Sequence, residues 1–85
     1  MLAVRERGHE RVLRQTVIAL RNGSSLTEHN SPGEATLQVL VGQVRLSWSD
    51  GAVDLDAGGH VVIPQERHGL LAVTDAVVLL TAAKI

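Results

Sequence analysis

The sequence predicts an all-β protein, a small antiparallel β-barrel or jelly roll folded as one domain. Short apolar runs rich in Val, Leu and Ile alternate along the chain with turns that contain glycine. No segment repeats its apolar residues at the 3.6-residue period of a helix. The 85 residues suffice for one domain, and they include no cysteine that could add a disulfide to it.

The composition favours a core made of branched aliphatic side chains. Hydrophobic residues make up 45% of the chain, yet Trp48 is its one aromatic residue. Val, Leu and Ile suit a pleated sheet. Trp48 lies on the apolar side of its predicted strand, so we expect it to pack in the core or against a second subunit rather than to form a stacking platform.

The first 14 residues are predicted to form a charged N-terminal arm, and residues 15–85 the barrel domain. Residues 5–14 hold four arginines and two glutamates. This mixture is typical of a solvated arm or of an edge strand, and the acids make an anion-binding patch the weaker alternative. The start of the chain lacks the basic-then-apolar order of a secretory signal.

Four strands are predicted in the first half of the chain, over residues 16–20, 26–29, 35–41 and 43–49. Asn22-Gly23 indicates a tight turn after the first of them. Pro32-Gly33 suits the two central positions of a type II turn, because proline presets the first φ and glycine supplies the positive second one. Gly42 is expected to separate the last two strands.

The second half begins with the strongest hairpin signal of the sequence. Asp50-Gly51 predicts a two-residue type I′ loop that leads into a strand over residues 52–55. Further strands are predicted over 61–63, 69–73 and 76–80, which gives about eight to ten in all. The run 76–80 is apolar on both faces and must be covered on both. The barrel interior covers one face, and we expect a second subunit, in a homodimer, to cover the other.

Two stretches of the chain resemble the two sequence motifs of the cupin superfamily. The resemblance extends over roughly residues 15–81 and is greatest to small single-domain bacterial cupins of the conserved-barrel, cupin-2 type. The matching positions in the two motifs are Gly23, His29, Gly42, Gly58, Pro64 and His68. The resemblance implies a small β-barrel that often holds one metal ion between its strands.

The family's metal site usually takes three histidines and a glutamate, and here His29 and His68 stand at matching positions. Ser31 occupies the place of another histidine, and a neutral hydroxyl is a weak ligand for the metals that histidine binds. Glu34 is a suitable carboxylate one residue away from the expected place. A bulge or an adjustment near residues 32–33 would be needed to turn its side chain inward.

The resemblance thus implies a metal set of His29, His68 and Glu34, an arrangement of two histidines and one carboxylate like that of non-haem iron oxygenases. The ion would be a single divalent metal, with Zn, Fe, Mn and Ni not distinguished, and no organic cofactor is expected. Alternatively, each of the two histidines is satisfied by a backbone carbonyl or by the other. His9 and His60 are expected at the surface.

We expect a small cupin-fold protein that binds a small-molecule ligand or a divalent metal in its barrel, with catalysis poorly developed or absent. The alternative is a metal-dependent enzyme of the dioxygenase or isomerase type that uses His29, His68 and a carboxylate. A third possibility is a scaffold or stress-related interaction module. Arg67 either attracts an acidic substrate or pairs with an acid such as Glu66.

Charge and hydropathy exclude several other classes of function. The net charge of −1 argues against a nucleic-acid or membrane-surface binder, because both rely on a positive excess. No apolar run approaches the roughly 20 residues that span a bilayer. The sequence also lacks a Gly-x-Ser-x-Gly turn and a phosphate-binding glycine loop. A cytoplasmic location is the default expectation.

Overall fold

The structure is a computed structural model, and it describes residues 2–7, 13–29 and 34–83. These residues form nine β-strands and no helix, so the all-β prediction is confirmed. Nothing in the described ranges has the length and apolarity of a membrane-crossing helix. The strands are β1 (Leu2–Arg7), β2 (Leu13–Leu20), β3 (Ser25–His29), β4 (Ala35–Val41), β5 (Gln43–Trp48), β6 (Gly51–Asp56), β7 (His60–Val62), β8 (His68–Ala72) and β9 (Ala76–Ala83).

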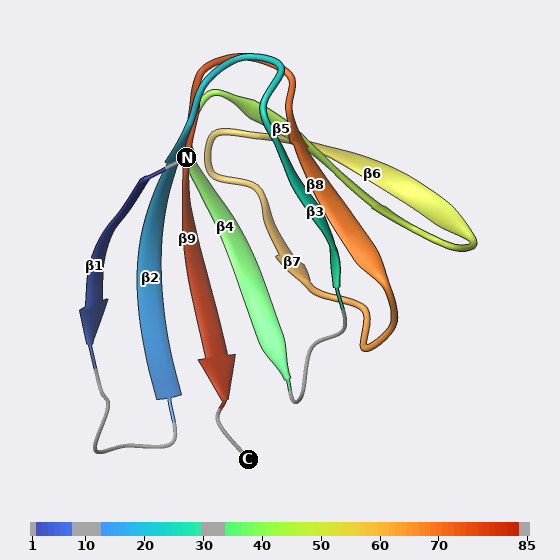
Figure 1. The fold of residues 1–85 in the computed structure, drawn as a ribbon, viewed down its shortest axis with the longest axis horizontal. Coiled ribbons are helices and arrows are strands. Elements are labelled where there is room, and N and C mark those ends of the chain that lie inside the picture. The colour runs from blue at the N-terminus through green and yellow to red at the C-terminus, as the bar shows by residue number, and fades with distance from the viewer. Residues whose placement is uncertain (1, 8–12, 30–33, 84–85) are drawn as a thin grey trace.

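The strands form two antiparallel sheets that belong to one small domain (Figure 1). One sheet has the order β1-β2-β9-β4-β7 and the other the order β3-β8-β5-β6. From β2 onward, the group 2-9-4-7 packs against the group 3-8-5-6. This is the strand order of an eight-stranded jelly roll, in which two Greek keys bring distant segments together. The predicted jelly roll is confirmed.

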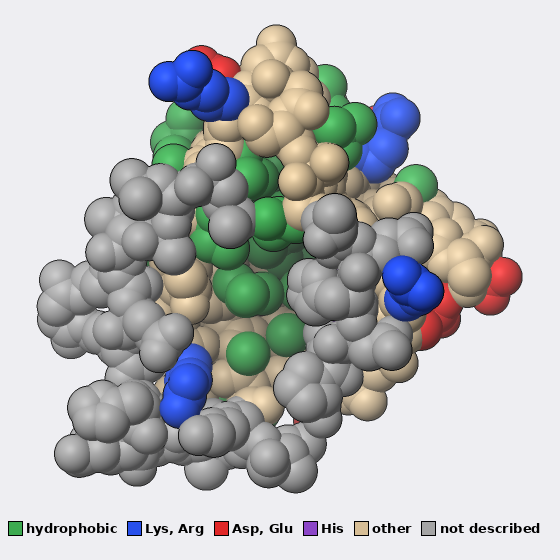
Figure 2. Space-filling view, viewed as in Figure 1, with side chains coloured by type: hydrophobic (Ala, Val, Ile, Leu, Met, Phe, Trp, Pro, Cys, Tyr) green, Lys and Arg blue, Asp and Glu red, His purple; other side chains and the backbone are tan. Residues whose placement is uncertain are grey.

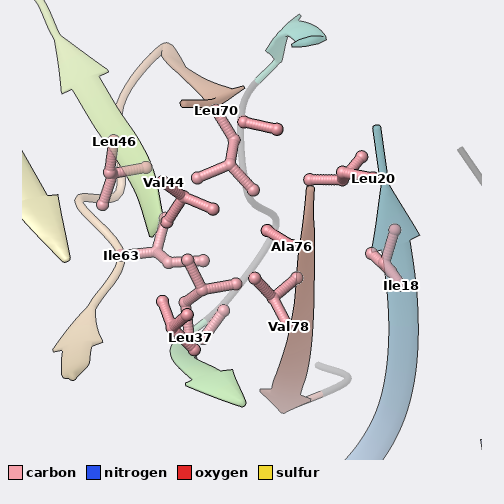
Figure 3. Close-up of a cluster of buried hydrophobic side chains, with 12 residues drawn as sticks. Ile18, Leu20, Leu37, Val44, Leu46, Ile63, Leu70, Ala76 and Val78 are labelled. Carbon is pink, nitrogen blue, oxygen red and sulfur yellow. The ribbon is translucent and has the colours of Figure 1, made fainter. Parts of the chain in front are cut away.

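The core lies between the two sheets and is built from alternate residues of their strands. In β4, for example, Ala35, Leu37 and Val39 are buried while Leu40 and Val41 are exposed. Figure 3 shows aliphatic side chains from both sheets meeting in this core. Trp48 packs against it, as its place on the apolar side of β5 predicted. The buried residues are Ile18, Leu20, Ala35, Leu37, Val39, Val44, Leu46, Ile63, Leu70, Ala72, Ala76 and Val78.

The N-terminal segment contributes the edge strand β1, which pairs with β2. An edge strand was one of the two roles expected of this charged segment. Strand β2 begins at Leu13, earlier than predicted, because it pairs with β9 along its whole length up to Ala83. Residues 8–12 and the turn predicted at residues 32–33 lie outside the described residues. The domain boundary at residue 14 stays a prediction.

The hairpin between β5 and β6 is confirmed, but its predicted turn type is wrong. Trp48 pairs with Gly51, so the two-residue loop is Ser49-Asp50 and Gly51 already belongs to the ladder. A type I′ turn needs positive φ at both loop residues, and no described residue other than glycine has one. Gly51 has a packing role instead. A Cβ atom at this position would lie 3.2 Å from the Trp48 ring.

Gly42 follows the last residue of β4, and both its backbone conformation and its close neighbours require glycine at this position. Its φ is 83°, in the left-handed region that favours glycine. A Cβ atom there would overlap the backbone carbonyl of Asp75 and lie 2.9 Å from the Cα atom of Ala76. The start of β9 therefore packs directly on the connection between β4 and β5, and the two sheets depend on this close approach.

We expect Gly42→Ala to lower the free energy of unfolding by at least about 2 kcal/mol, because backbone strain and a backbone clash add together. Gly23→Ala is the matched control. Gly23 has the same kind of backbone, with φ 84°, but nothing lies within 4 Å of its added Cβ. The Gly23→Ala substitution should lower the free energy of unfolding by about 1 kcal/mol. Urea unfolding followed by circular dichroism measures both, and equal losses would contradict a steric role for the contact with Asp75.

Candidate functional site

Among the residues whose burial the structure describes, His68 is the polar one that lies buried in the core. It is the first residue of β8 and is 5% exposed. Its ring Nδ1 lies 2.8 Å from the backbone carbonyl oxygen of Glu66. A carbonyl can only accept, so a neutral His68 ring carries its proton on Nδ1 and its lone pair on Nε2. A hydrogen bond from one ring nitrogen to a backbone carbonyl is a usual way in which proteins orient a metal-binding imidazole.

Strand pairing places position 29 directly opposite His68. Strand β3 pairs with β8 through Leu26 and Leu70, and then through His29 and His68. From Leu26 onward, regular pairing would put residue 28 opposite His68. A register shift between Leu26 and His29 supplies one extra residue and brings His29 there instead. The side chain of His29 lies outside the described part of the structure, and its place in a metal set stays a prediction.

On its other side, β8 pairs with β5, where Trp48 is the register partner of His68. Ser49, the residue after Trp48, donates a hydrogen bond from its hydroxyl to the carboxylate of Glu66. The side chain of Glu66 is thereby tied to the β5–β6 loop while its carbonyl holds the His68 ring. From the sequence, Glu66 was expected only as a possible partner for Arg67, and this role was not predicted. Its position two residues before His68 was the available signal.

A small apolar cavity lies against His68 between the two sheets. Its volume is about 40 Å³, and residues of both sheets line it. Figure 2 shows hydrophobic side chains gathered at the centre of the molecule, between the strands of the two sheets. Apart from His68, its lining is aliphatic side chains and one glycine: Ile18, Leu26, Leu37, Leu46, Ile63, Gly69, Leu70 and Leu80.

Glu34 is exposed and sits just before β4. Its neighbour Ala35 is buried in the core, so the alternation of strand residues places Glu34 on the outer face. It lines a separate hollow, together with Leu13 and Thr81, that shares no residue with the cavity at His68. The structure therefore brings positions 29 and 68 together but does not bring Glu34 to them. A role for Glu34 stays a prediction.

The other residues singled out in the sequence lie at the surface or beyond the described residues. His60 and Arg67 are exposed. His9 and Ser31 lie outside the described ranges.

A well-formed ion pair joins Arg45 to Asp54 across β5 and β6 at 2.6 Å. The hydrogen bond from Arg45 lowers the pKa of the Asp54 carboxyl, but this pair lies on the outer face of its sheet and is no part of the site.

The donor set suits a metal ion only in part. Within the described residues, no three histidine, cysteine or acidic side chains gather as a metal site would require. What the fold does supply is one buried imidazole with an oriented Nε2 and a second histidine at the opposite register position. Two histidines would leave the remaining coordination positions to water or to a ligand.

We expect NMR of uniformly 15N-labelled protein, at a pH high enough for neutral imidazoles, to show the Nδ1-protonated tautomer for His68. The reason is the hydrogen bond from Nδ1 to Glu66. His60 is exposed and serves as the internal reference for a solvated ring. The same mixture of tautomers at both residues would contradict the orientation described here.

Neither a family model nor a curated protein matches the sequence, but solved structures match the fold. A conserved protein of unknown function from Streptococcus pyogenes is 28% identical with a TM-score of 0.85, over 95% of this chain and 72% of that one. An RmlC-like cupin protein from Desulfovibrio desulfuricans is 27% identical with a TM-score of 0.79, over 92% and 77%.

A cupin superfamily protein from Desulfitobacterium hafniense has a TM-score of 0.84 at 15% identity, over 99% of this chain and 75% of that one. These likenesses extend over almost the whole chain and agree with the jelly-roll strand order and with the resemblance seen in the two motifs. The chain is a small member of the cupin superfamily.

Proposed function

We propose that this protein binds a single divalent metal ion, or a ligand of similar size, at His29 and His68 inside its barrel, with catalysis poorly developed or absent. The observation that supports this most is the pairing of the two histidine positions across β3 and β8. The buried His68 ring, oriented by the carbonyl of Glu66, would be the fixed ligand.

The size of the cavity favours an ion over an organic substrate held within it. A water molecule needs at least about 10–15 Å³ measured in this way, and pockets for drug-sized ligands have about 300–1,000 Å³. At about 40 Å³, the cavity admits a metal ion with one or two waters but no enclosed organic molecule. A larger ligand would have to bind at the mouth of the barrel and reach the ion from there.

The metal-dependent enzyme remains the second candidate, and the described side chains favour it less. It requires a carboxylate beside the two histidines, and Glu34, the predicted one, is exposed just before β4. When bound, a metal ion with open positions would supply Lewis acidity or an activated water. The chain's own contribution would be to hold the His68 ring and to surround it with aliphatic side chains that limit water.

We further propose that the protein is a homodimer, joined through the outer face of the five-stranded sheet. Four of the large exposed hydrophobic residues belong to strands of this sheet and are 43–66% exposed: Leu13, Leu40, Val41 and Val62. Two others, Leu71 and Val73, are less exposed at 37% and lie on or beside β8. Two open hollows, of about 440 and 230 Å³, lie at opposite ends of this sheet and would receive side chains of a second copy.

The size of this face sets an upper limit on the proposed interface. The five strands hold 32 residues, and at about 3.3 Å per residue and about 4.8 Å between strands their face presents on the order of 500 Å². Specific interfaces start at about 600 Å² per partner, so the dimer is expected to be weak. The outer face of the other sheet carries the Arg45–Asp54 ion pair and is the less suitable surface.

For the metal proposal, we expect isothermal titration with Zn²⁺ and with Ni²⁺ to show one site per chain. His29→Ala or His68→Ala should weaken binding by about 100-fold or more, since loss of a group that only hydrogen-bonds to a metal ligand already costs about 10–100-fold. His60→Ala is the matched control, because His60 is an exposed histidine on β7, and it should bind as the unmodified protein does.

Equal affinity in all three variants would contradict the site. Elemental analysis of the purified protein addresses the enzyme alternative. The proposal that catalysis is poorly developed would be overturned by two results together. The purified protein would contain about one tightly bound metal ion per chain, and it would turn over a substrate with an activity that His29→Ala or His68→Ala abolishes.

For the dimer proposal, we expect sedimentation velocity at tens of micromolar to give twice the monomer mass. Val41→Glu should shift the protein to monomer, because it places a charge among the exposed apolar residues of the proposed interface. Leu71→Glu, a change of the same kind on the outer face of the other sheet, should leave the dimer intact. A monomer in the unmodified protein, or dissociation by Leu71→Glu alone, would be inconsistent with this interface.

A further inference from the structure

The carbonyl group that orients His68 lies outside the strand ladders of both sheets. It belongs to Glu66, in the bend at residues 65–67 that precedes β8. Strand pairing of β8 begins at His68, opposite His29 of β3 and Trp48 of β5. The ladders therefore fix the backbone of His68 but leave the direction of the Glu66 carbonyl to other contacts.

One such contact is a side-chain hydrogen bond to the loop between β5 and β6. The Ser49 hydroxyl donates to the carboxylate of Glu66. Ser49 directly follows Trp48, and the backbone of Trp48 pairs with Gly51 on one side. On the other side it pairs with His68. The Trp48 ring also packs against Gly51, where an added Cβ atom would lie 3.2 Å from it, so Ser49 is attached to a firmly held part of β5.

These contacts close a ring of interactions that includes Glu66. Its carboxylate is bonded to Ser49 and its carbonyl to the Nδ1 atom of His68, while β5 and β8 are paired with each other. The bond to Ser49 removes conformational freedom from Glu66, so less entropy is left to oppose the bond to His68. Ser49 and Glu66 are exposed, whereas His68 is buried. A hydrogen bond at the surface thus bears on the orientation of a ring in the core.

We propose that Ser49 is a positioning residue for His68. Through the side chain of Glu66, its hydroxyl holds the carbonyl that keeps the His68 proton on Nδ1 and makes Nε2 the metal-binding atom. Partners that hydrogen-bond to a metal ligand commonly fix its tautomer and ring orientation in this way. The β5–β6 loop contributes to the affinity of the site without touching the ion. The part of this inference that concerns affinity rests on the proposed function, but the orientation of the ring can be measured without a metal.

The first measurement is the tautomer of His68 in metal-free, 15N-labelled protein, by NMR at a pH high enough for neutral imidazoles. Ser49→Ala should lower the ratio of the Nδ1-protonated form to the other tautomer by about 2- to 10-fold, the range that one hydrogen bond contributes to an equilibrium constant. Ser49→Thr keeps the hydroxyl and should keep the ratio. Ser47→Ala is the matched control, because it removes a hydroxyl two residues earlier, within the ladder and opposite Gly69.

The second measurement is the affinity for Zn²⁺ by isothermal titration. Ser49→Ala and Glu66→Ala should each weaken binding by about 3- to 10-fold, because each breaks the same hydrogen bond. Glu66→Gln retains an oxygen that accepts from Ser49 and should bind nearly as the unmodified protein does. The double variant Ser49→Ala/Glu66→Ala should bind no more weakly than Glu66→Ala alone.

The outcomes separate this inference from the proposed function. An unchanged His68 tautomer in Ser49→Ala would overturn the positioning role, as would additive losses of Zn²⁺ affinity in the double variant. Zn²⁺ binding at the histidines that is equal in the unmodified protein and in Ser49→Ala would also overturn it, and would leave the metal proposal standing. A changed tautomer in a protein that binds no Zn²⁺ would support the positioning role and overturn the metal proposal alone. If Ser49→Ala does not fold, as circular dichroism would show, the comparison of Glu66→Ala with Glu66→Gln decides.

Discussion

The packing of aliphatic side chains between two sheets is the interaction on which the rest of this structure depends. The chain has no disulfide and one aromatic residue, so a small set of Val, Leu, Ile and Ala side chains must hold the sheets together. Val39, Val44, Leu46 and Val78 are almost wholly shielded from water. In so small a domain every such contact matters, because the fraction of surface buried on folding is low. The close approach of Gly42 to the start of β9 belongs to the same constraint.

Within this core, the position of His68 is decided by its hydrogen bond and by strand pairing. An imidazole can be buried at little cost where one ring nitrogen is satisfied, and the carbonyl of Glu66 does this. The irregular pairing between Leu26 and His29 then brings the second histidine position opposite. Bulges of this kind re-aim residues next to functional sites in many sheets. A metal site that uses both histidines would depend on this one extra residue in β3.

The small cavity and the outer face of the five-stranded sheet are two separate features of this fold. Aliphatic side chains line the cavity, and His68 stands at its polar side. The exposed apolar residues on the outer face of the five-stranded sheet form a separate surface suited to a second copy.

The sequence by itself determined the all-β class, most strand positions, the tight turn at Asn22-Gly23 and the family resemblance, because alternation and turn residues act locally. The tight turn is closed by a 2.9 Å bond from the Ser24 amide to the Arg21 carbonyl. Only the tertiary structure decided three other features. Gly51 serves the packing of Trp48 rather than a type I′ turn, Glu34 faces outward, and Ser49 bonds to Glu66. Each depends on which strand lies opposite and in what register, and register is set by contacts between residues far apart in the chain.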